Sequence, residues 1–192
     1  MSPDELPRIG HDASTFAAFY RENVEAVQRF IARRVEDPQL AADLTAEVFL
    51  AAIEAAPSYR EDRGTPTAWL FGIARVVVAS QARRRARERH AVARIAGRRL
   101  LESDDVARIQ ERIDAASQAR GLYAALGRLP AGERAIFELV ALDELSVTDA
   151  AAALGIRNVT ARVRLHRARA TLRRQLSDER STADLEPMEA SP

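Results

Sequence analysis

The chain has 192 residues, of which 47% are apolar and 30% are charged, and its formal net charge is +1. It contains no cysteine, which excludes disulfide frameworks, thiolate metal sites and cysteine catalysis, and its three histidines lie far apart in the sequence. No apolar run approaches the roughly 20 residues that span a bilayer, and residues 1–10 lack the apolar core of a secretory signal. We therefore expect a cytoplasmic protein without membrane insertion that uses no metal and no cofactor.

The first half of the chain predicts helices only. Residues 1–12 hold two prolines and few apolar side chains, so we expect a disordered lead-in. Apolar residues recur at helical spacing from Phe16 until Asp37-Pro38 interrupts them, and a second such run ends before Pro57. After a polar loop, Thr65-Pro66 starts a third helix, because threonine caps a helix well and proline is tolerated at the first helical position.

The second half is divided from the first by residues 96–118, which are charged and weakly apolar and predict a linker. Helical spacing resumes over 119–142, and Ser146–Asp149 forms a capping box that opens a short helix ending at Gly155. A last helix runs from 158 to about 176, and the acidic residues 177–192 predict a mobile tail. The fold class is therefore all-α, with two small helical domains over residues 13–95 and 119–176.

The basic residues gather in two islands. All 29 are arginine, with eight between Arg83 and Arg99 and seven between Ile156 and Leu176, where there is no acid. Arginine usage by itself is explained equally well by genome composition. Clustered arginine, in contrast, is the usual electrostatic footprint of a polyanionic partner.

The second island lies in a helix-turn-helix pattern, made by residues 146–154, a turn at Gly155 and the helix from 158. At 100° per residue one face of the last helix is apolar, and the opposite face presents Thr160, Val163, His166, Arg167 and Arg174, flanked by Arg162 and Arg164. A DNA recognition helix needs this division, because its arginines contact guanine edges and phosphates while its apolar back packs on the domain. The alternative is a basic amphipathic helix whose arginines are solvated.

The first island continues the helix that contains Trp69. Its arginines suit phosphate contacts, and the loop 58–67 with Tyr59 and Trp69 is able to receive an unstacked base. A solvated linker end explains the charges equally well, and Trp69 is in phase with Leu70 and Ile73, as a core residue would be. No paired carboxylates, Ser/His/Asp set or glycine-rich phosphate loop is present, so no enzyme activity is expected.

Four segments resemble the extracytoplasmic-function (ECF) class of bacterial sigma factors, the smallest members of the sigma-70 family. Each is short, but together they follow the family's order and spacing over roughly residues 14–176. The segments are Ala42-Asp-Leu-Thr-Ala-Glu-Val-Phe-Leu50, Thr67-Ala-Trp-Leu-Phe-Gly-Ile-Ala-Arg75, Leu126-Gly-Arg-Leu-Pro130 with Glu133-Arg134, and Ala153-Leu-Gly-Ile156 with Arg162-Val-Arg-Leu-His-Arg-Ala-Arg169.

The resemblance implies a factor that binds the clamp and flap of core RNA polymerase and lends it promoter choice. Region two of the family docks on the clamp, for which the matching residues are Asp43, Glu47, Phe49 and Leu50. It also melts the minus-ten element and captures a flipped base, for which we expect Tyr59, Arg60, Arg63, Trp69, Arg75, Val76, Ser80, Arg83 and Arg84. Region four reads the minus-thirty-five element in the major groove, with Thr160, Arg162, Val163, Arg164, His166, Arg167 and Arg169.

Three departures from the family pattern affect specificity. Val76 stands where an asparagine is usual and Ala79 where an aspartate is usual, so we expect minus-ten specificity to rest more on the loop. Val163 replaces a serine of the recognition helix, which predicts a different minus-thirty-five sequence and a thymine methyl contact.

An anti-sigma factor often sequesters members of the family, so we expect such a partner.

Two alternatives belong to other classes. A helix-turn-helix regulator that acts on an operator would share the C-terminal half, but it would need a ligand, phosphoacceptor or dimerisation domain where residues 14–95 match region two. A helical adaptor that never contacts nucleic acid would leave both arginine islands without a partner.

Overall fold

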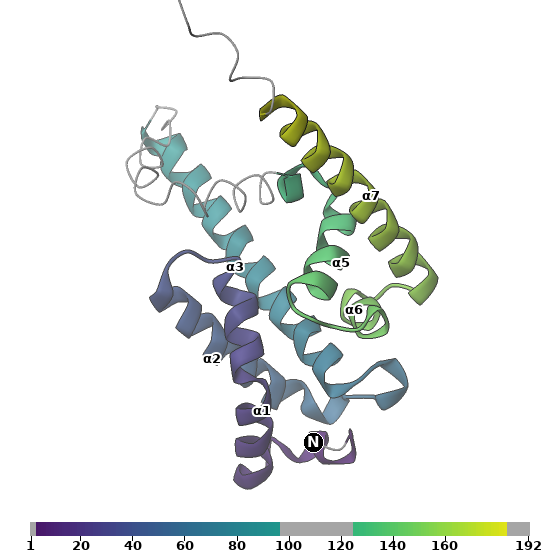
Figure 1. Ribbon diagram of the computed structural model, residues 1–192. Helices are drawn as coiled ribbons and strands as arrows, with labels where there is room; N and C mark the ends of the chain where they lie inside the picture. Colours follow the sequence, from purple (N-terminus) through teal and green to yellow (C-terminus); the bar gives the residue numbers. More distant parts are fainter. Residues whose placement is uncertain (1–2, 97–124, 184–192) are drawn as a thin grey trace, which may run out of the picture.

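A computed structural model of the chain describes residues 3–96 and 125–183 (Figure 1). Within these ranges every regular element is a helix, which confirms the predicted fold class. The predicted linker at 96–118, apart from its first residue, and residues 184–192 of the predicted tail lie outside the described residues. The elements are η1 (Pro3–Arg8), α1 (Ala13–Ala32), α2 (Pro38–Ala55), η2 (Ala56–Ser58), η3 (Glu61–Arg63), α3 (Pro66–Ala96), α5 (Ala131–Ala141), α6 (Val147–Leu154) and α7 (Asn158–Ala183), where η denotes a 3-10 helix.

Aspartates cap the first two long helices. Asp12 accepts hydrogen bonds from the backbone and side-chain donors of Ser14 and Thr15, and these bonds hold the pKa of its carboxyl well below the usual range. Asp37 caps α2 through the backbone N–H of Gln39 at 2.9 Å, and Pro38 occupies the first helical position. Both sites satisfy N–H groups that have no partner inside the helix.

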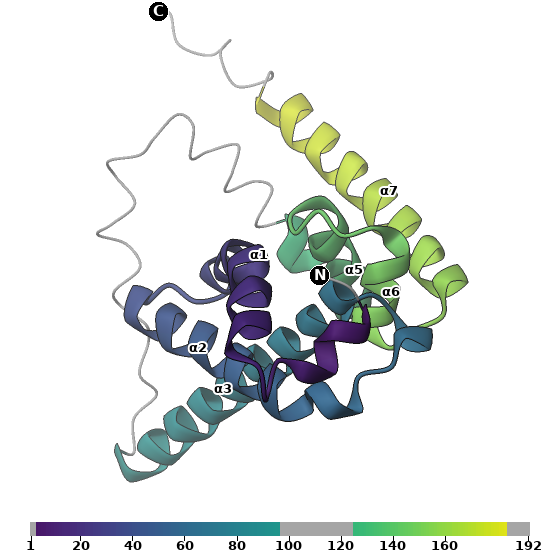
Figure 2. The same cartoon turned by 90° about the horizontal axis from the view of Figure 1, so that it is seen from below.

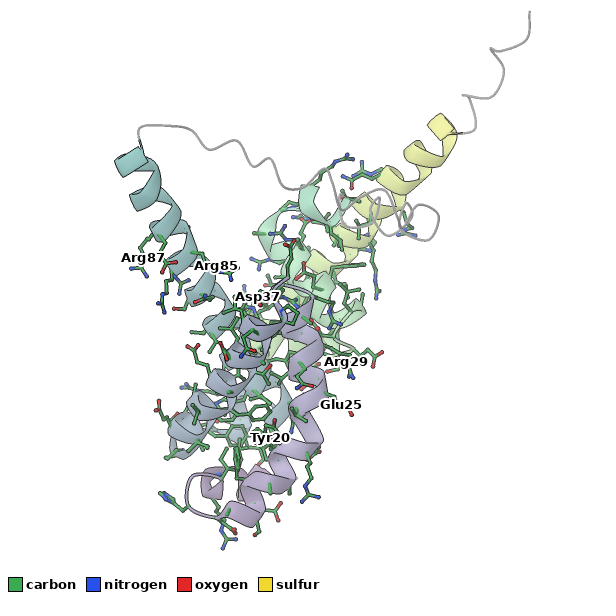
Figure 3. All side chains as sticks on the ribbon, turned by 90° about the vertical axis from the view of Figure 1, so that its left-hand side faces the viewer. Tyr20, Glu25, Arg29, Asp37, Arg85 and Arg87 are labelled. Carbon is green, nitrogen blue, oxygen red and sulfur yellow. The ribbon has the colours of Figure 1, made fainter. Side chains whose placement is uncertain are left out.

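The core of the first domain is formed by α1, α2 and the first half of α3. Phe30 meets Phe71 edge to face, with 5.4 Å between ring centroids, and Phe19 meets Phe49 at 6.0 Å. The second half of α3 extends away from this core, and Arg85 and Arg87 are exposed along it (Figure 3). No helix among the described residues is long and apolar enough to cross a membrane.

The predicted disordered lead-in at residues 1–12 is wrong for residues 3–12. The structure folds Pro3–Arg8 as η1 and buries Leu6 and Ile9, which are 0% and 3% exposed. Backbone hydrogen bonds continue the segment into α1, including Ile9 N–H to Leu6 O at 3.2 Å and Asp12 N–H to Arg8 O at 2.9 Å. Two apolar side chains are sufficient to fix this segment because both are removed from water.

The second domain consists of a helical turn at residues 125–128 followed by α5, α6 and α7. Ser146 caps α6 through the backbone N–H of Asp149, and α6 ends at Gly155, whose φ of 63° places it in the left-handed conformation. Glycine adopts this conformation without steric cost, which allows the tight turn into α7. The apolar face predicted for α7 is buried, since Ala161, Leu165, Ala168 and Leu172 are all at most 4% exposed.

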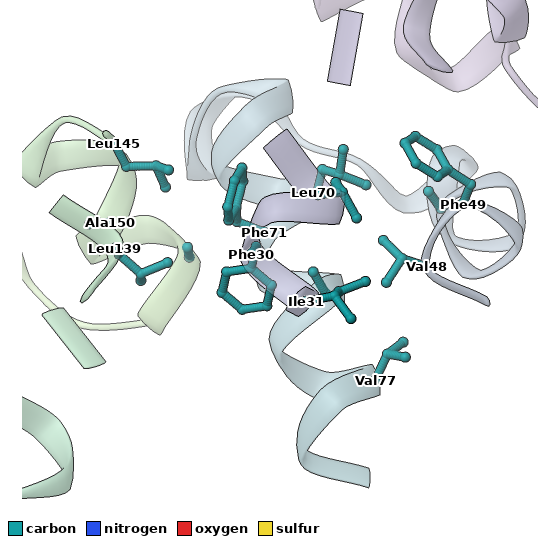
Figure 4. Close-up of a cluster of buried hydrophobic side chains, with 14 of the residues drawn as sticks. Phe30, Ile31, Val48, Phe49, Leu70, Phe71, Val77, Leu139, Leu145 and Ala150 are labelled. Carbon is teal, nitrogen blue, oxygen red and sulfur yellow. The ribbon is translucent and has the colours of Figure 1, made fainter. Parts of the chain in front are cut away.

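The two domains pack against each other. Figures 1 and 2 show α1 and α2 on one side of the first half of α3 and α5–α7 on the other, and α6 makes the main contact with α3. Buried side chains of both domains share one cluster, in which Phe30 and Phe71 of the first domain lie beside Leu139 and Leu145 of the second (Figure 4), while the second domain has a smaller cluster of its own. The two domains therefore share a core.

Ion pairs reinforce this contact. Arg33 and Arg34, at the end of α1, both bind Asp143, whose side chain is 0% exposed, and Arg34 also binds Glu138 at 2.8 Å. The Arg34 guanidinium lies 3.7 Å from the centroid of the Phe30 ring. Because the carboxylate of Asp143 is shielded from water, its attraction to two arginines is stronger than that of an exposed pair.

Candidate polymerase and nucleic-acid interfaces

The outward face of α7 carries most of the predicted recognition residues. Arg162, His166 and Arg167 are exposed, and Val163 lies between them with 44% of its surface accessible. The buried apolar face on the other side of α7 fixes the helix to the domain, so these side chains project from a fixed position. Val159, one turn earlier, is 71% exposed, and it adds a second apolar side chain that the sequence analysis did not select.

Two predicted residues on α7 lie to the side of this face. Arg164 is half-buried against the first turn of α5, where a Cβ added to Gly132 would lie 3.0 Å from its guanidinium. Arg169 is exposed beside a groove of about 720 Å³ between α7 and the start of α6, with Phe137 in its lining. The guanidinium of Arg164 therefore lies beside α5 in this structure, and not among the exposed side chains of the outward face.

The predicted base-reading loop is internally bonded. The phenol of Tyr59 donates a hydrogen bond to Gly64 O at 2.9 Å, and its ring meets Trp69 edge to face at 5.7 Å. Burial, with the nearby charge of Glu61, raises the pKa of Tyr59. Both aromatic side chains are half-buried, and each already has an aromatic neighbour.

A cavity of about 520 Å³ lies between this loop and α3. Its lining combines arginine with apolar surface, which suits a base attached to a phosphate backbone. Gly72 of α3 also lines it, and a Cβ added to this residue would lie 3.7 Å from Ala153 O. The predicted residues that line it are Arg60, Arg63, Trp69 and Val76, and the second domain closes one side with Ala152 and Ala153.

The other minus-ten candidates lie outside this cavity. Arg75 donates to Ala153 O at 3.0 Å, and burial, together with the nearby Arg34, lowers its pKa. The structure thus commits Arg75 to the contact between the domains. Ser80, Arg83 and Arg84 are exposed further along α3, beyond the loop.

The predicted polymerase-binding residues divide into exposed and buried groups. Asp43, Glu47 and Leu50 are exposed on α2, and Leu50 has 62% of its surface accessible. Phe49, which was predicted to contact the clamp, is only 2% exposed in this structure and packs on Phe19 and Tyr20. Tyr20 is 37% exposed, and its ring centroid lies 4.7 Å from that of Phe49.

Family models match both halves of the chain. The model for Sigma-70 region 2 matches residues 19–88, and the model for Sigma-70, region 4 matches residues 119–172. The ECF RNA polymerase sigma factors SigD of Mycobacterium tuberculosis and Mycobacterium bovis are each 38% identical over 157 residues, covering 77% of this chain and 72% of SigD. The chain belongs to the ECF class of the sigma-70 family. It is a sigma factor, which binds core RNA polymerase and directs it to promoters.

Two solved structures share the fold. CnrH, solved in complex with the cytosolic domain of CnrY, has a TM-score of 0.62 at 23% identity, covering 92% of this chain and 99% of that one. The sigma factor RpoE from Bartonella quintana, solved with the anti-sigma factor NepR, has a TM-score of 0.60 at 27% identity, covering 84% and 96%. The fold of this sigma factor therefore spans both regions.

The contact between regions two and four was not predicted. Its polar residues, Asp143, Asp149 and Thr65, read in the sequence as loop or capping residues, and Thr65 donates to the Asp149 carboxylate at 2.6 Å. The sequence of α6 could have indicated this contact, because the helix has little charge and is alanine-rich on nearly all sides. A short helix of this kind needs a second surface to cover it.

Proposed function

We propose that the two arginine-rich surfaces of this sigma factor read the two promoter elements. The outward face of α7, with Arg162, Val163, His166 and Arg167, would enter the major groove of the minus-thirty-five element. This assignment rests on one observation: three cationic or polar side chains and an exposed valine share the face opposite the buried one. Arginine suits guanine edges, and valine suits a thymine methyl group.

The minus-ten element would be read at the cavity between the base-reading loop and α3. Arg60 and Arg63 would contact phosphates, while the apolar wall beside Trp69 and Val76 would receive an unstacked base. Because Ala152 and Ala153 close one side of this cavity, we propose that α6 leaves α3 when the promoter is bound. Arg75 would then be released from Ala153 O for contact with DNA.

The polymerase would dock on the exposed face of α2. Asp43 and Glu47 place two carboxylates one helical turn apart beside the exposed Leu50, a combination that suits a basic partner surface with an apolar centre. Phe49 would support this face from the core side, by holding α2 and Tyr20 in place. The chain would work in the cytoplasm, catalyse no reaction itself and be held inactive by an anti-sigma factor, as the complex of RpoE with NepR supports.

Charge-reversal variants of α2 and alanine variants of α7, each measured for both affinities, test these assignments. Asp43→Arg combined with Glu47→Arg reverses the charge of the α2 face and should abolish binding to core polymerase, while affinity for a minus-thirty-five duplex stays unchanged. Arg162→Ala and Arg167→Ala should each weaken binding to that duplex by about 1–3 kcal/mol and leave the affinity for core polymerase unchanged. Both affinities are measured by fluorescence anisotropy on the same proteins.

Each assignment is refuted by a different result of these measurements. Full core affinity in the charge-reversed variant would refute docking on α2. Unchanged duplex affinity in both arginine variants would refute the position of α7 in the groove. Tight duplex binding without any core affinity in the wild-type chain would instead favour an operator-binding regulator.

A further inference from the structure

The N-terminal arm, residues 3–12, is folded although it lies outside the residues 19–88 that match Sigma-70 region 2. Leu6 is fully buried and Ile9 nearly so, both within the main core cluster. Backbone hydrogen bonds from Ile9, His11 and Asp12 hold the arm in one conformation up to the start of α1. The arm is therefore a structured addition to region two.

The arm packs beneath the segment that leads into the base-reading loop. η1 contacts η2, and Ala56, the first residue of η2, is 0% exposed. Gly10 lies against the end of α2, where a Cβ added to it would be 3.5 Å from Ile53 O. η2 ends at Ser58, so the residue that follows the supported segment is Tyr59.

The far end of the base-reading loop is held by α6, through the hydrogen bond that Thr65 donates to Asp149 at 2.6 Å. The side-chain hydrogen bonds of Tyr59 and Arg60 stay within the loop: Tyr59 donates to Gly64 O, and the guanidinium of Arg60 donates to Asp62 at 3.1 and 3.3 Å. Its far end is anchored at Thr65, whose side chain accepts a hydrogen bond from Ala68 N–H at 3.2 Å. The orientation of its near end depends on η2, and η2 lies on the arm.

We propose that the N-terminal arm is a positioning element for minus-ten recognition. Leu6 and Ile9 hold η2 so that Ser58 and Arg60 stay at the cavity that receives the base. The arm itself contacts no DNA in this arrangement. The inference rests on the proposed minus-ten role of the cavity, and it assigns part of base selectivity to residues outside the matched family regions.

Base discrimination by the holoenzyme tests the arm. The probe is a forked promoter DNA with a duplex minus-thirty-five element and a single-stranded minus-ten segment, taken from a promoter found by run-off transcription. Each minus-ten base is replaced in turn by an abasic site, and discrimination is the ratio of the two affinities. Unfolding lowers both affinities equally, so a merely structural defect leaves this ratio unchanged.

We expect Leu6→Ser with Ile9→Ser to reduce the largest discrimination ratio at least fivefold, while affinity for core polymerase stays within twofold. Should the double variant fail to fold, Ile9→Ala is measured in its place, with a smaller reduction in the same direction. Ile9→Val keeps the apolar contact and should keep the ratio. Val27→Ala is the matched control, because Val27 is a fully buried residue of α1 well beyond the end that meets the arm.

The outcomes distinguish failure of the arm proposal from failure of the proposed minus-ten role of the cavity. A wild-type ratio above one that persists in the arm variants would overturn the role of the arm and leave the minus-ten site intact. Equal loss of the ratio in Val27→Ala would also overturn it, because base discrimination would then depend on the packing of the whole first domain and not on the arm. A wild-type ratio of one at every base would refute the minus-ten cavity itself, and the arm proposal with it.

Discussion

Gly64 marks the closest approach of region four to the base-reading loop, and its replacement by alanine has two separable costs. The residue has φ 142° and ψ 168°, a conformation that residues with a Cβ enter at a cost of about 1–3 kcal/mol. A Cβ there would lie 2.8 Å from the Cβ of Ala152 in α6, which is about 1 Å inside ordinary carbon–carbon contact. Since both carbons are fixed to backbone, rotation cannot relieve the overlap, which adds about 1–3 kcal/mol.

The free energy of unfolding of Gly64→Ala should therefore fall by about 2–6 kcal/mol. Ala152→Gly alone should cost about 1 kcal/mol, because glycine is a poorer helix former. In the double variant the overlap is absent, so the two changes should couple by about 1–3 kcal/mol. Urea unfolding of the four proteins, followed by circular dichroism, measures this coupling.

Two control glycines calibrate the result. Gly155 has φ 63° and open space around its added Cβ, so Gly155→Ala should show strain alone, at about 1–2 kcal/mol. Gly127 is free of both features and lies in the helical turn 125–128, so Gly127→Ala should leave stability unchanged or raise it by up to about 1 kcal/mol. If Gly64→Ala and Ala152→Gly add within about 0.5 kcal/mol, then α6 does not lie against the loop and the packed arrangement is refuted.

Three further predictions concern single side chains. Val163→Ser should change the preferred base at one or two positions of the minus-thirty-five element by about 1–3 kcal/mol, as measured by selection from randomised duplexes; a uniform loss over all sequences would contradict the methyl contact. Asp143→Asn should lower the free energy of unfolding by about 3 kcal/mol, because Arg33 would lose its buried carboxylate, and an Arg33→Met, Asp143→Leu pair that restores stability would confirm the cause. Since the pKa of Tyr59 is raised, the folded chain holds that proton more tightly than the unfolded one, so stability should fall as pH rises through and above 10. Tyr59→Phe should remove part of that alkaline slope in urea unfolding, and an unchanged slope would contradict it.

Local rules predicted the elements well. The capping residue at Thr65, the capping box at Ser146 and the glycine at 155 each act within a few residues, and each lies where the structure begins or ends a helix. The apolar face of α7 was also predicted, because period and burial agree on a helix with one covered side. α7 itself runs to Ala183, past the predicted end near 176, because no helix breaker intervenes.

Features that depend on tertiary contacts were missed. Phe49 and Tyr20 both fit an apolar spacing, and only their mutual packing decides that the first is buried and the second is at the surface. The burial of Leu6 requires η2 as a partner, which local composition does not reveal. The carboxylate of Asp143 follows α5 in a polar loop, and its role appears only when Arg33 is brought beside it.

Run-off transcription tests the central claim most directly. Core RNA polymerase is incubated with fragmented genomic DNA, with the wild-type chain, with the Asp43→Arg, Glu47→Arg variant, or with neither. The account predicts discrete new transcripts with the wild-type chain only, and their upstream sequences should share two elements at minus ten and minus thirty-five. An unchanged transcript pattern from a wild-type chain that demonstrably binds core polymerase would contradict it.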